Sequence, residues 1–428
     1  MSSGAPPPAG PSRRGRIRSV LVDVEPLRRD RDFRLLWIGQ IVSGTGRQIT
    51  AVALPYQLYV LTGSTLAVGL LAVVQLVPIL AFALGGGAIA DAVDRRRLLI
   101  LTQLGLMATS VAFAGLSLLA SPPLVLLYAV AFVSAGLAAL DGPARSSAIP
   151  RLVPRERLTS ALALGQLSFQ VISVAGPLVG GLILATAGLV AAYVVDAVTF
   201  LAALAALLLI APLPPAPGAP RPSLRSIAEG LRFARGHRPI LGTFVIDLNA
   251  MVFGFPTSLF PALALDVFKV GPAGVGLLNA APAVGALIGA LLTGWTSRVV
   301  RPGRAIAAAV GAWGLAIVAF GLLTASFPLA LACLAVAGAA DVVSAVLRNA
   351  IVQLETPDEL RGRVMSIHTL VVTSGPKLGD AEAAAVSAVV GPTASVVSGG
   401  ILTLVGLAWI VRAFPELIRY ELRARDAR

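Results

Sequence analysis

Long apolar runs separated by short polar stretches make up most of this chain of 428 residues. A helix needs about 20 apolar residues to cross a bilayer, and the sequence holds about a dozen runs of that length. We expect helices at about residues 33–61, 66–90, 98–119, 123–142, 158–186, 189–210, 239–265, 274–296, 305–324, 328–349, 364–389 and 394–412. The pattern predicts an all-α polytopic membrane protein with twelve transmembrane helices.

Composition supports a membrane protein and excludes several classes of function. Hydrophobic residues are 57% of the chain and charged residues only 13%. Cys333 is the single cysteine, and His237 and His368 are far apart, so we expect no disulfide framework and no metal site. Neither Lys269 nor Lys377 ends a G-x-x-x-x-G-K loop, which disfavours an ATP-driven pump. We expect no cofactor and no enzymatic activity.

The placement of the basic residues predicts the topology. Nearly all of the 34 arginines and lysines fall in the two tails and in every second loop; of the other loops only one carries a basic residue, Lys269. Basic loops remain on the cytoplasmic side of a membrane, so both termini are expected there, in the plasma (inner) membrane. The net charge of +13 therefore reflects topology and a lipid partner, and we expect no nucleic-acid binding.

The chain divides into two halves joined by a proline-rich linker. The predicted parts are a disordered basic N-terminal tail (1–31), a six-helix bundle (32–211), a cytoplasmic linker (212–238), a second six-helix bundle (239–412) and a cytoplasmic tail (413–428). In the linker, Leu224, Ile227, Leu231 and Ala234 share one helical face. This suits a short helix at the inner membrane surface, although a charged connector could have the same pattern.

The two halves repeat each other. Three echoes occur in order along the chain: Gly69 with Gly276 at an offset of 207, Arg145 with Arg348 at 203, and the segment 176–180 with 375–379 at 199. Many secondary transporters are built from duplicated halves, with substrate sites between them. The repeat predicts two pseudo-symmetric bundles.

A dense group of charges lies between the second and third apolar runs. Its spacing fits the signature G-x-x-x-D-x-x-x-R-[RK] between helices two and three of the major facilitator superfamily, with Gly87, Asp91, Arg95 and Arg96 in the motif positions. The chain departs from the usual pattern at Ala92 and Asp94. The alternative interpretation is a simple cytoplasmic stop signal.

A second motif supports the resemblance to this superfamily. The fifth predicted helix matches the core of its antiporter signature g-x-x-x-G-P-x-x-G-G through Gly176, Pro177, Gly180 and Gly181, with Ile172 in place of the leading glycine. An ordinary packing face of small residues is the alternative. The phrases at 143–154 and 358–364 are similar to the enterobactin-exporter and macrolide-efflux (drug:proton antiporter) branch.

Ionisable residues inside the bilayer are costly, so each is a functional candidate. They are Arg47, Asp196, Asp247, Asp341, Lys377, Asp380 and Glu382. Related proton-coupled exporters carry acids in helices seven and ten, so the resemblance implies that Asp247 and Asp341 couple transport to protons. Asp196 and Glu382 are reserve candidates, and Arg47 is a candidate counter-charge. For each residue, a structural charge pair is the alternative.

The resemblance implies a secondary active exporter of an amphiphilic small molecule, such as a siderophore, a macrolide or another drug-like metabolite. Proton antiport would drive it by alternating access, and we expect a monomer. Trp37, Gln40, Phe253 and Phe255 are expected to line the substrate cavity. A proton-coupled importer and a transport-dead sensor with the same fold are the alternatives.

We expect Asp91→Asn to fold and insert normally but to lose most transport, because the resemblance makes this loop a conformational latch. The measurement is export by a variant expressed at the wild-type level. Near wild-type export would contradict a latch role for Asp91.

The topology predicts which sites a membrane-impermeant thiol reagent reaches from outside. Cysteines introduced near Thr62 and Ser121 should be labelled in intact cells, and a cysteine near Ser223 should react only after lysis. The reverse pattern would refute the predicted orientation.

Overall fold

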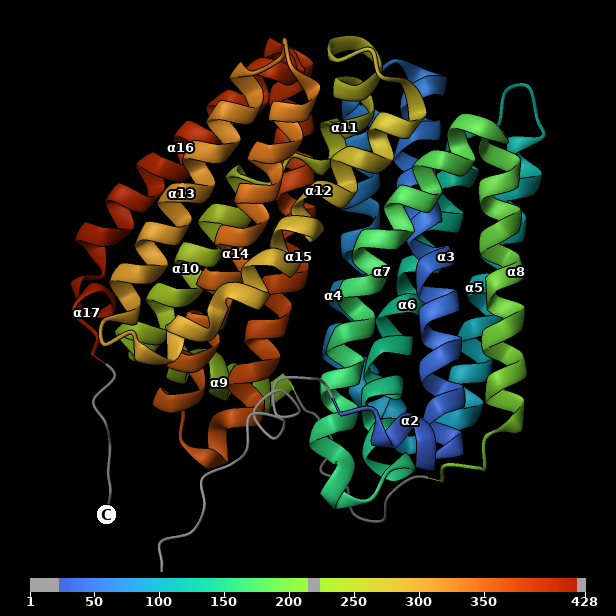
Figure 1. Cartoon of the computed structure of the whole chain (residues 1–428), viewed down its shortest axis with the longest axis horizontal. Helices are drawn as coiled ribbons and strands as arrows, with labels where there is room; N and C mark the ends of the chain where they lie inside the picture. Colours follow the sequence, from blue (N-terminus) through green and yellow to red (C-terminus); the bar gives the residue numbers. More distant parts are fainter. Residues whose placement is uncertain (1–22, 215–223, 422–428) are drawn as a thin grey trace, which may run out of the picture.

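The computed structural model describes residues 23–214 and 224–421, and their side chains except at 83–92, 224–228 and 297. Every regular element in these ranges is helical (Figure 1). The first part of the chain holds α2 (Glu25–Arg29), α3 (Arg31–Thr62), α4 (Thr65–Ala92), α5 (Arg95–Ser117), α6 (Leu124–Leu152), the turn η1 (Arg155–Arg157), α7 (Leu158–Thr186) and α8 (Gly188–Leu209). The second part holds α9 (Leu224–Gly236), α10 (Arg238–Phe253), the turn η2 (Thr257–Leu259), α11 (Phe260–Ala262), the π-helical turn η3 (Leu263–Val267), α12 (Gly271–Leu292), the turn η4 (Thr293–Arg298), α13 (Pro302–Leu322), α14 (Phe327–Glu355), α15 (Asp358–Val390), α16 (Pro392–Ala413) and α17 (Pro415–Ile418).

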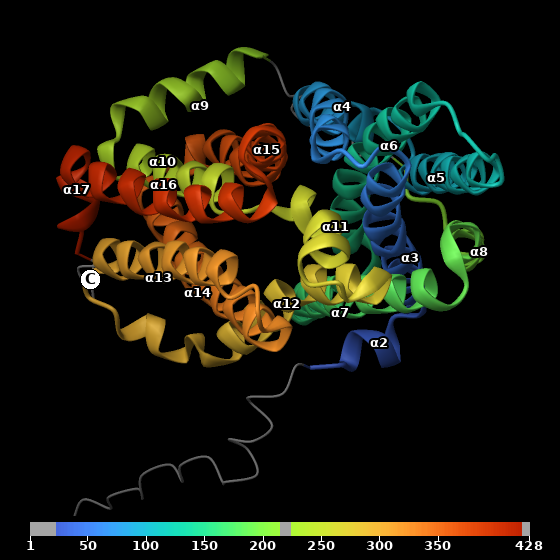
Figure 2. The same cartoon turned by 90° about the horizontal axis from the view of Figure 1, so that it is seen from above.

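The long helices form two bundles that lie side by side, α3 to α8 and α10 to α16 (Figures 1 and 2). In the described part of the chain, ten spans are long and apolar enough to cross a membrane, and one of them joins α10 to η3. The other two long helices, α3 and α15, carry more charged residues. The predicted fold of twelve helices in two six-helix bundles is confirmed.

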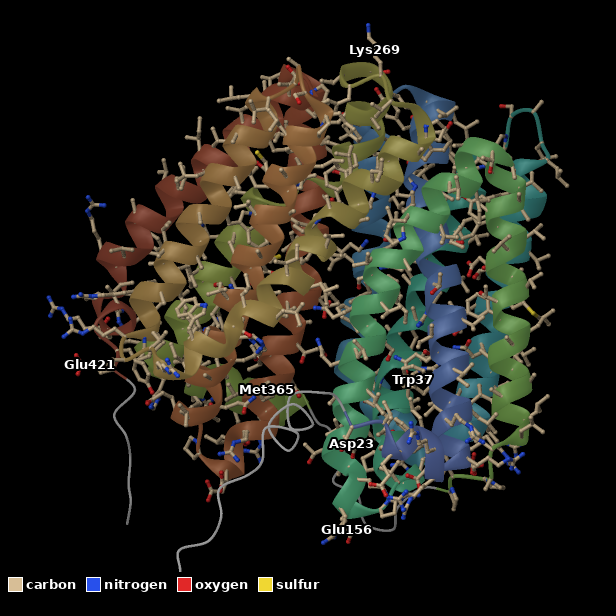
Figure 3. The ribbon with its side chains drawn as sticks, in the orientation of Figure 1. Asp23, Trp37, Glu156, Lys269, Met365 and Glu421 are labelled. Carbon is tan, nitrogen blue, oxygen red and sulfur yellow. The ribbon has the colours of Figure 1, made fainter. Side chains whose placement is uncertain are left out.

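The two ends of the molecule differ. Lys269 marks one end, beside α11, whereas Asp23 and Glu156 lie at the other, near α2 and α9 (Figure 3). We call these the α11 end and the α9 end.

The seventh predicted helix, expected at 239–265 without interruption, is broken. Regular α10 ends at Phe253, and the chain continues through Gly254 and Pro256 into η2, α11 and η3. A proline has no N–H group and disfavours helical geometry in the residue before it, which explains the break. At the break, the backbone N–H group of Ser258 donates a hydrogen bond to the carboxylate of Asp380 on α15 at 2.7 Å.

Small residues let the two bundles touch at two equivalent places. At the contact of α7 with α12, a Cβ atom added to Gly276 would lie 2.4 Å from the carbonyl oxygen of Pro177 and 2.7 Å from the Cα of Gly181. At the contact of α4 with α15, a Cβ on Gly69 would lie 2.3 Å from the Cβ of Ala384. Because Gly69 and Gly276 are repeat partners, these two joints are related by the internal repeat.

The antiporter-type motif on α7 also packs against α3. A Cβ on Gly176 would lie 2.3 Å from Gln48 Cβ, and one on Gly180 would lie 3.1 Å from Ile49 Cα. Ile172, which replaces the leading glycine of the motif, lies over Gly44 of α3. The glycine that the motif lacks on α7 is therefore matched by a glycine on the facing helix.

The apolar core joins the bundles at one end only. One buried cluster contains residues of both bundles, among them Leu54, Leu58, Val68 and Tyr193 with Leu259, Phe260, Val275 and Phe320. The four other clusters each belong to a single bundle, and residues of α2, α9 or α17 contribute to three of them. The bundles are thus sealed toward the α11 end and packed separately toward the α9 end.

The linker helix α9 packs on the second bundle. Its Ala234 is buried with Ile240, Phe244 and Val364, and Glu229 forms an ion pair with Arg363 of α15 at 2.6 Å. The helix predicted here is present, and its position at the membrane surface stays a prediction.

The α7–α12 joint leads to a prediction about stability. Gly276→Val should lower the apparent melting temperature of the detergent-purified protein by several degrees, because backbone atoms that cannot move aside occupy the space; overpacking of this kind costs about 1–3 kcal/mol. Gly165→Val is the matched control, since Gly165 lies in α7 with open space around its Cα. Equal melting temperatures for the two variants would contradict a close joint.

Candidate functional site: a cavity between the two bundles

A cavity of about 1250 Å³ lies between the bundles. At one extreme its wall includes residues of the shared core, such as Leu54, Val68 and Val275. At the other it includes Glu359 and Arg363, at the start of α15 beside α9. The cavity is therefore closed toward the α11 end and reaches toward the α9 end.

One face of α15 forms a polar wall of this cavity. Its lining residues recur every three or four positions, as expected for one side of a helix: Glu359, Arg363, Ser366, Thr369, Thr373, Lys377 and Asp380. The first bundle contributes a largely apolar wall, which includes Val52, Leu71, Ile79, Phe82 and Phe113. The site combines an apolar surface with one polar stripe.

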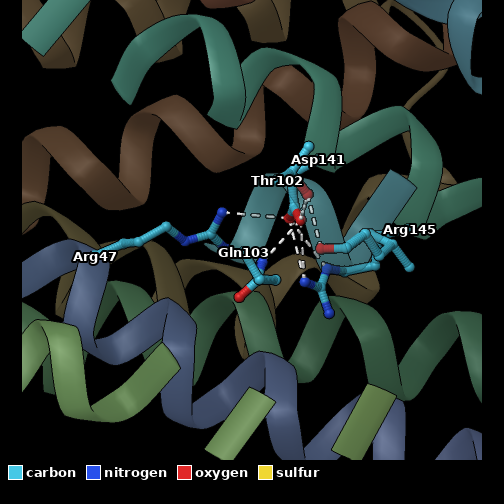
Figure 4. A network of polar contacts seen from close by, with 6 residues as sticks. Arg47, Thr102, Gln103, Asp141 and Arg145 are labelled. Carbon is cyan, nitrogen blue, oxygen red and sulfur yellow. Dashed lines mark hydrogen bonds and ion pairs between the residues drawn. The ribbon is translucent and has the colours of Figure 1, made fainter. Parts of the chain in front are cut away.

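A charge cluster in the first bundle is centred on Asp141 of α6. Two arginines approach this buried carboxylate from opposite sides, with Arg47 Nη1 at 3.5 Å and Arg145 Nη2 at 3.2 Å (Figure 4). Thr102 Oγ1 and Gln103 Nε2 of α5 donate to the same carboxylate at 3.0 and 2.8 Å. Two cations thus share one anion.

The second bundle holds the opposite arrangement. Arg348 of α14 lies 2.7 Å from Asp247 of α10 and 3.6 Å from Asp341 of its own helix. Its Nη1 also donates to Ser344 Oγ at 2.7 Å. Here two acids share one cation, so the charges of the three side chains cannot all be matched while both acids are ionised.

The internal repeat relates these two clusters. The offset of 203 that pairs Arg145 with Arg348 also pairs Asp141 with Ser344, and in both halves the arginine contacts the residue four positions earlier. The first bundle keeps an acid at this position, whereas in the second a serine replaces it and acids at 247 and 341 lie beside the arginine. The structure thus places the predicted acids in helices seven and ten together.

The remaining predicted ionisable residues lie in different surroundings. Asp196 lines the cavity and accepts hydrogen bonds from Thr50 at 2.5 Å and Ser110 at 2.7 Å. Arg47 also lines the cavity, but it pairs with Asp141 and not with Asp247 or Asp341. Glu382 is half-buried on α15, outside the polar stripe.

The four residues expected to line the cavity lie elsewhere. Trp37 of α3 donates to the carbonyl of Leu164 on α7 at 2.9 Å and packs near α2. Phe255 lies against Trp313, with the ring centroids 6.1 Å apart. Neither of them, nor Gln40 or Phe253, is among the lining residues. The sequence predicts how far along its helix each of these four residues lies, but it does not predict the direction in which each side chain points.

The loop motif between α4 and α5 is described in part. The side chains of Gly87 and Asp91 lie outside the described residues. Arg96 donates from Nε and Nη2 to the carbonyls of Leu207 and Leu208, both at 2.8 Å, and Arg95 Nε donates to Ser147 at 3.0 Å. Cations at the carbonyl end of a helix are favourable, so Arg96 fastens the start of α5 to the end of α8.

Two charged residues of the site, Asp141 and Arg348, were not selected from the sequence as intramembrane candidates. Asp141 was missed because an acid near the end of a predicted helix resembles a loop residue, whereas α6 continues to Leu152. Lys377 Nζ of α15 lies in the cavity wall and donates to Gln75 Oε1 of α4 at 2.7 Å. The polar spacing along α15 was a signal that could have identified the cavity face.

In the described part of the chain, no group of histidine, cysteine, aspartate and glutamate side chains could hold a metal ion. Two six-helix bundles around a cavity with charges held inside the membrane-spanning region define a polytopic membrane transporter. The match to known sequences is more specific. The family model described as transmembrane secretion effector matches residues 23–426, so the chain belongs to this family of the major facilitator superfamily, as its motifs predicted.

Relatives of known name support this assignment along nearly the whole chain. The enterobactin exporter EntS of Escherichia coli O127:H6 is 30% identical over 409 residues, which cover 94% of this chain and 97% of the relative. The same exporter of Citrobacter koseri is 31% identical with the same coverage. The family is one of transporters and not of enzymes.

Solved structures share the fold. A bacterial homologue of the iron transporter ferroportin in an inward-facing state matches with a TM-score of 0.70 at 16% identity, covering 91% of this chain and 99% of that one. A bacterial homologue of the human lysosomal transporter Spinster, inward-facing and unoccupied, matches with a TM-score of 0.71 at 17% identity, covering 91% and 98%.

Proposed function

We propose that this protein is a secondary active exporter of an amphiphilic organic molecule of the siderophore type, driven by proton antiport through alternating access. The observation that carries the proposal is the cavity between the bundles, closed at one end by a core that both bundles share. The likeness to enterobactin exporters over 94% of the chain favours a siderophore-type cargo.

The α9 end faces the cytoplasm in this proposal, because the basic loops and the linker lie there. The structure then corresponds to an inward-facing state that receives substrate from inside. At the α11 end, the hydroxyl of Tyr59 on α3 donates to Asp266 of η3. This bond crosses between the bundles, so it must break, together with the shared core, when the cavity opens outward.

Proton coupling is assigned to Asp247 and Asp341. Both acids depend on the single guanidinium of Arg348, and they come from two helices, α10 and α14. A shift of α10 against α14 changes how that one positive charge is shared, so the protonation of the pair responds to the conformation of the bundle. Asp141 has two arginines and two hydrogen-bond donors, so the same reasoning makes it a structural anion.

The test uses purified protein in liposomes with an acidic lumen and enterobactin outside. In molecules whose cytoplasmic side faces outward, the wild type should concentrate enterobactin inside. Asp247→Asn and Asp341→Asn should each abolish this uphill uptake but retain downhill exchange, because exchange needs no proton cycle.

Asp358→Asn is the matched control, since that side chain is 82% exposed and pairs with Arg361 of its own helix turn. It should behave as the wild type. If both core variants still concentrate substrate, these acids are structural and the coupling site lies elsewhere. If the wild type moves no enterobactin in either mode, this cargo is excluded.

A further inference from the structure

Lys377 occupies an unusual position for a lysine. It lies near the middle of α15, its ammonium group faces the cavity, and Nζ is 2.7 Å from the amide oxygen of Gln75 on α4. A cation in a membrane-spanning segment is costly and needs a partner. A neutral amide from the opposite bundle is the only hydrogen-bond partner that the described residues provide.

No described carboxylate lies within ion-pair distance of Lys377, although Asp380 follows one helical turn later. The Asp380 carboxylate is engaged by Thr257 Oγ1 at 2.5 Å and by the N–H group of Ser258 at 2.7 Å. It caps the broken α10 segment. The ammonium group of Lys377 therefore faces the cavity with no ion pair among the described residues, although the Asp380 carboxylate is close enough to interact with it electrostatically.

A second cation on the cavity wall has only a shared partner. Arg47 and Arg145 both form an ion pair with Asp141, and 31% of the Arg47 side chain is exposed. The same inner wall also holds two carboxylates, Asp196 bound by Thr50 and Ser110, and Asp380 bound by Thr257 and Ser258. Arg363, paired with Glu229, and Glu359 lie at the mouth. Lys377, whose described hydrogen-bond partner is neutral, and Arg47, whose carboxylate partner is shared, thus place one cation from each bundle on the inner cavity wall.

Lys377 differs in character from the residue that the internal repeat pairs with it. At the offset of 199 its partner is Leu178 of α7, an apolar residue in the middle of the antiporter-type motif. A lysine at that position brings no packing advantage. A charged residue at a position that favours an apolar one is costly, and such exceptions are expected at functional sites.

We propose that Lys377, assisted by Arg47, binds the anionic group of the exported molecule, so that the substrate class is an amphiphilic organic anion. The inference rests on the proposed function and specifies its substrate. The anion takes the place of the Gln75 amide on the ammonium group, and the apolar wall formed by residues such as Leu71, Ile79 and Phe82 holds the body of the molecule. Because Lys377 and Gln75 belong to different bundles, binding exchanges a contact between the bundles for a contact with substrate.

The test compares two probes with the same aromatic frame, the anion 8-anilinonaphthalene-1-sulfonate and the neutral N-phenyl-1-naphthylamine. Binding to the full chain is measured in nanodiscs of phosphatidylcholine, with empty nanodiscs subtracted. The wild type should favour the anion. Lys377→Met should weaken binding of the anion by about tenfold or more, as expected for the loss of one charge-assisted hydrogen bond, and should change binding of the neutral probe by less than about twofold.

Two further variants complete the design. Lys377→Arg keeps the charge and should retain most of the preference. Lys269→Met removes the only other lysine of the chain, at the α11 end, and should have no effect. Equal binding of the two probes by the wild type, or an equal loss of both in a monodisperse Lys377→Met protein, would overturn the proposal.

The source of the anion is tested by adding phosphatidylglycerol to the nanodiscs. If this lipid displaces the anionic probe from the wild type but not from Lys377→Met, the site holds a lipid headgroup and the substrate assignment fails. Enterobactin transport in liposomes remains a separate readout. A protein that exports but shows no charge preference loses this inference and keeps the proposed function.

Discussion

Close contact between backbones at the two glycine joints is the constraint on which the rest of the architecture depends. In lipid there is little hydrophobic force between helices, so association relies on tight packing of small residues. At Gly276 the neighbouring atoms are backbone atoms of α7, and at Gly69 they belong to α15. These joints hold the bundles together through a few small contacts while the rest of the space between them remains available for a cavity.

The same duplicated chain has evolved two opposite electrostatic centres. Around Asp141 the cations are in excess, and around Arg348 the acids are. A buried group with spare partners resists a change of charge state, whereas a group that must share its partner is sensitive to small movements. The repeat thus places a cluster with spare cations in one bundle and a cluster with spare acids in the other.

Much of the fold could be predicted from the sequence because apolar length and arginine placement are dominated by the bilayer. The boundaries of α7 agree with the predicted 158–186, since the charged turn η1 precedes that run and Ala187 and Gly188, the latter with a positive φ, end it. The break after Phe253 was missed because its cause is partly tertiary: the prolines were visible, but the acid that caps the freed backbone is more than a hundred residues away.

For the site, Asp247 and Asp341 were recognised from their depth in the membrane. The partner Arg348, the role of Lys377 and the four misplaced cavity residues depend on the rotation of each helix about its axis, which a one-dimensional pattern of nearly uniform apolar residues does not fix.

The linker has a mechanical consequence. Its first residues are anchored on the first bundle, where the backbone N–H group of Arg95 donates to the carbonyl of Leu213 and Arg151 donates to the carbonyl of Pro214. Helix α9 is anchored on the second bundle through the ion pair of Glu229 with Arg363. Nine residues, 215–223, lie between Pro214 and the start of α9 in the sequence. Because a chain spans at most ~3.6 Å per residue, the distance from Pro214 to Leu224 is limited to roughly 36 Å. The covalent length of the linker therefore sets an upper limit on how far the two bundles can separate at the α9 end.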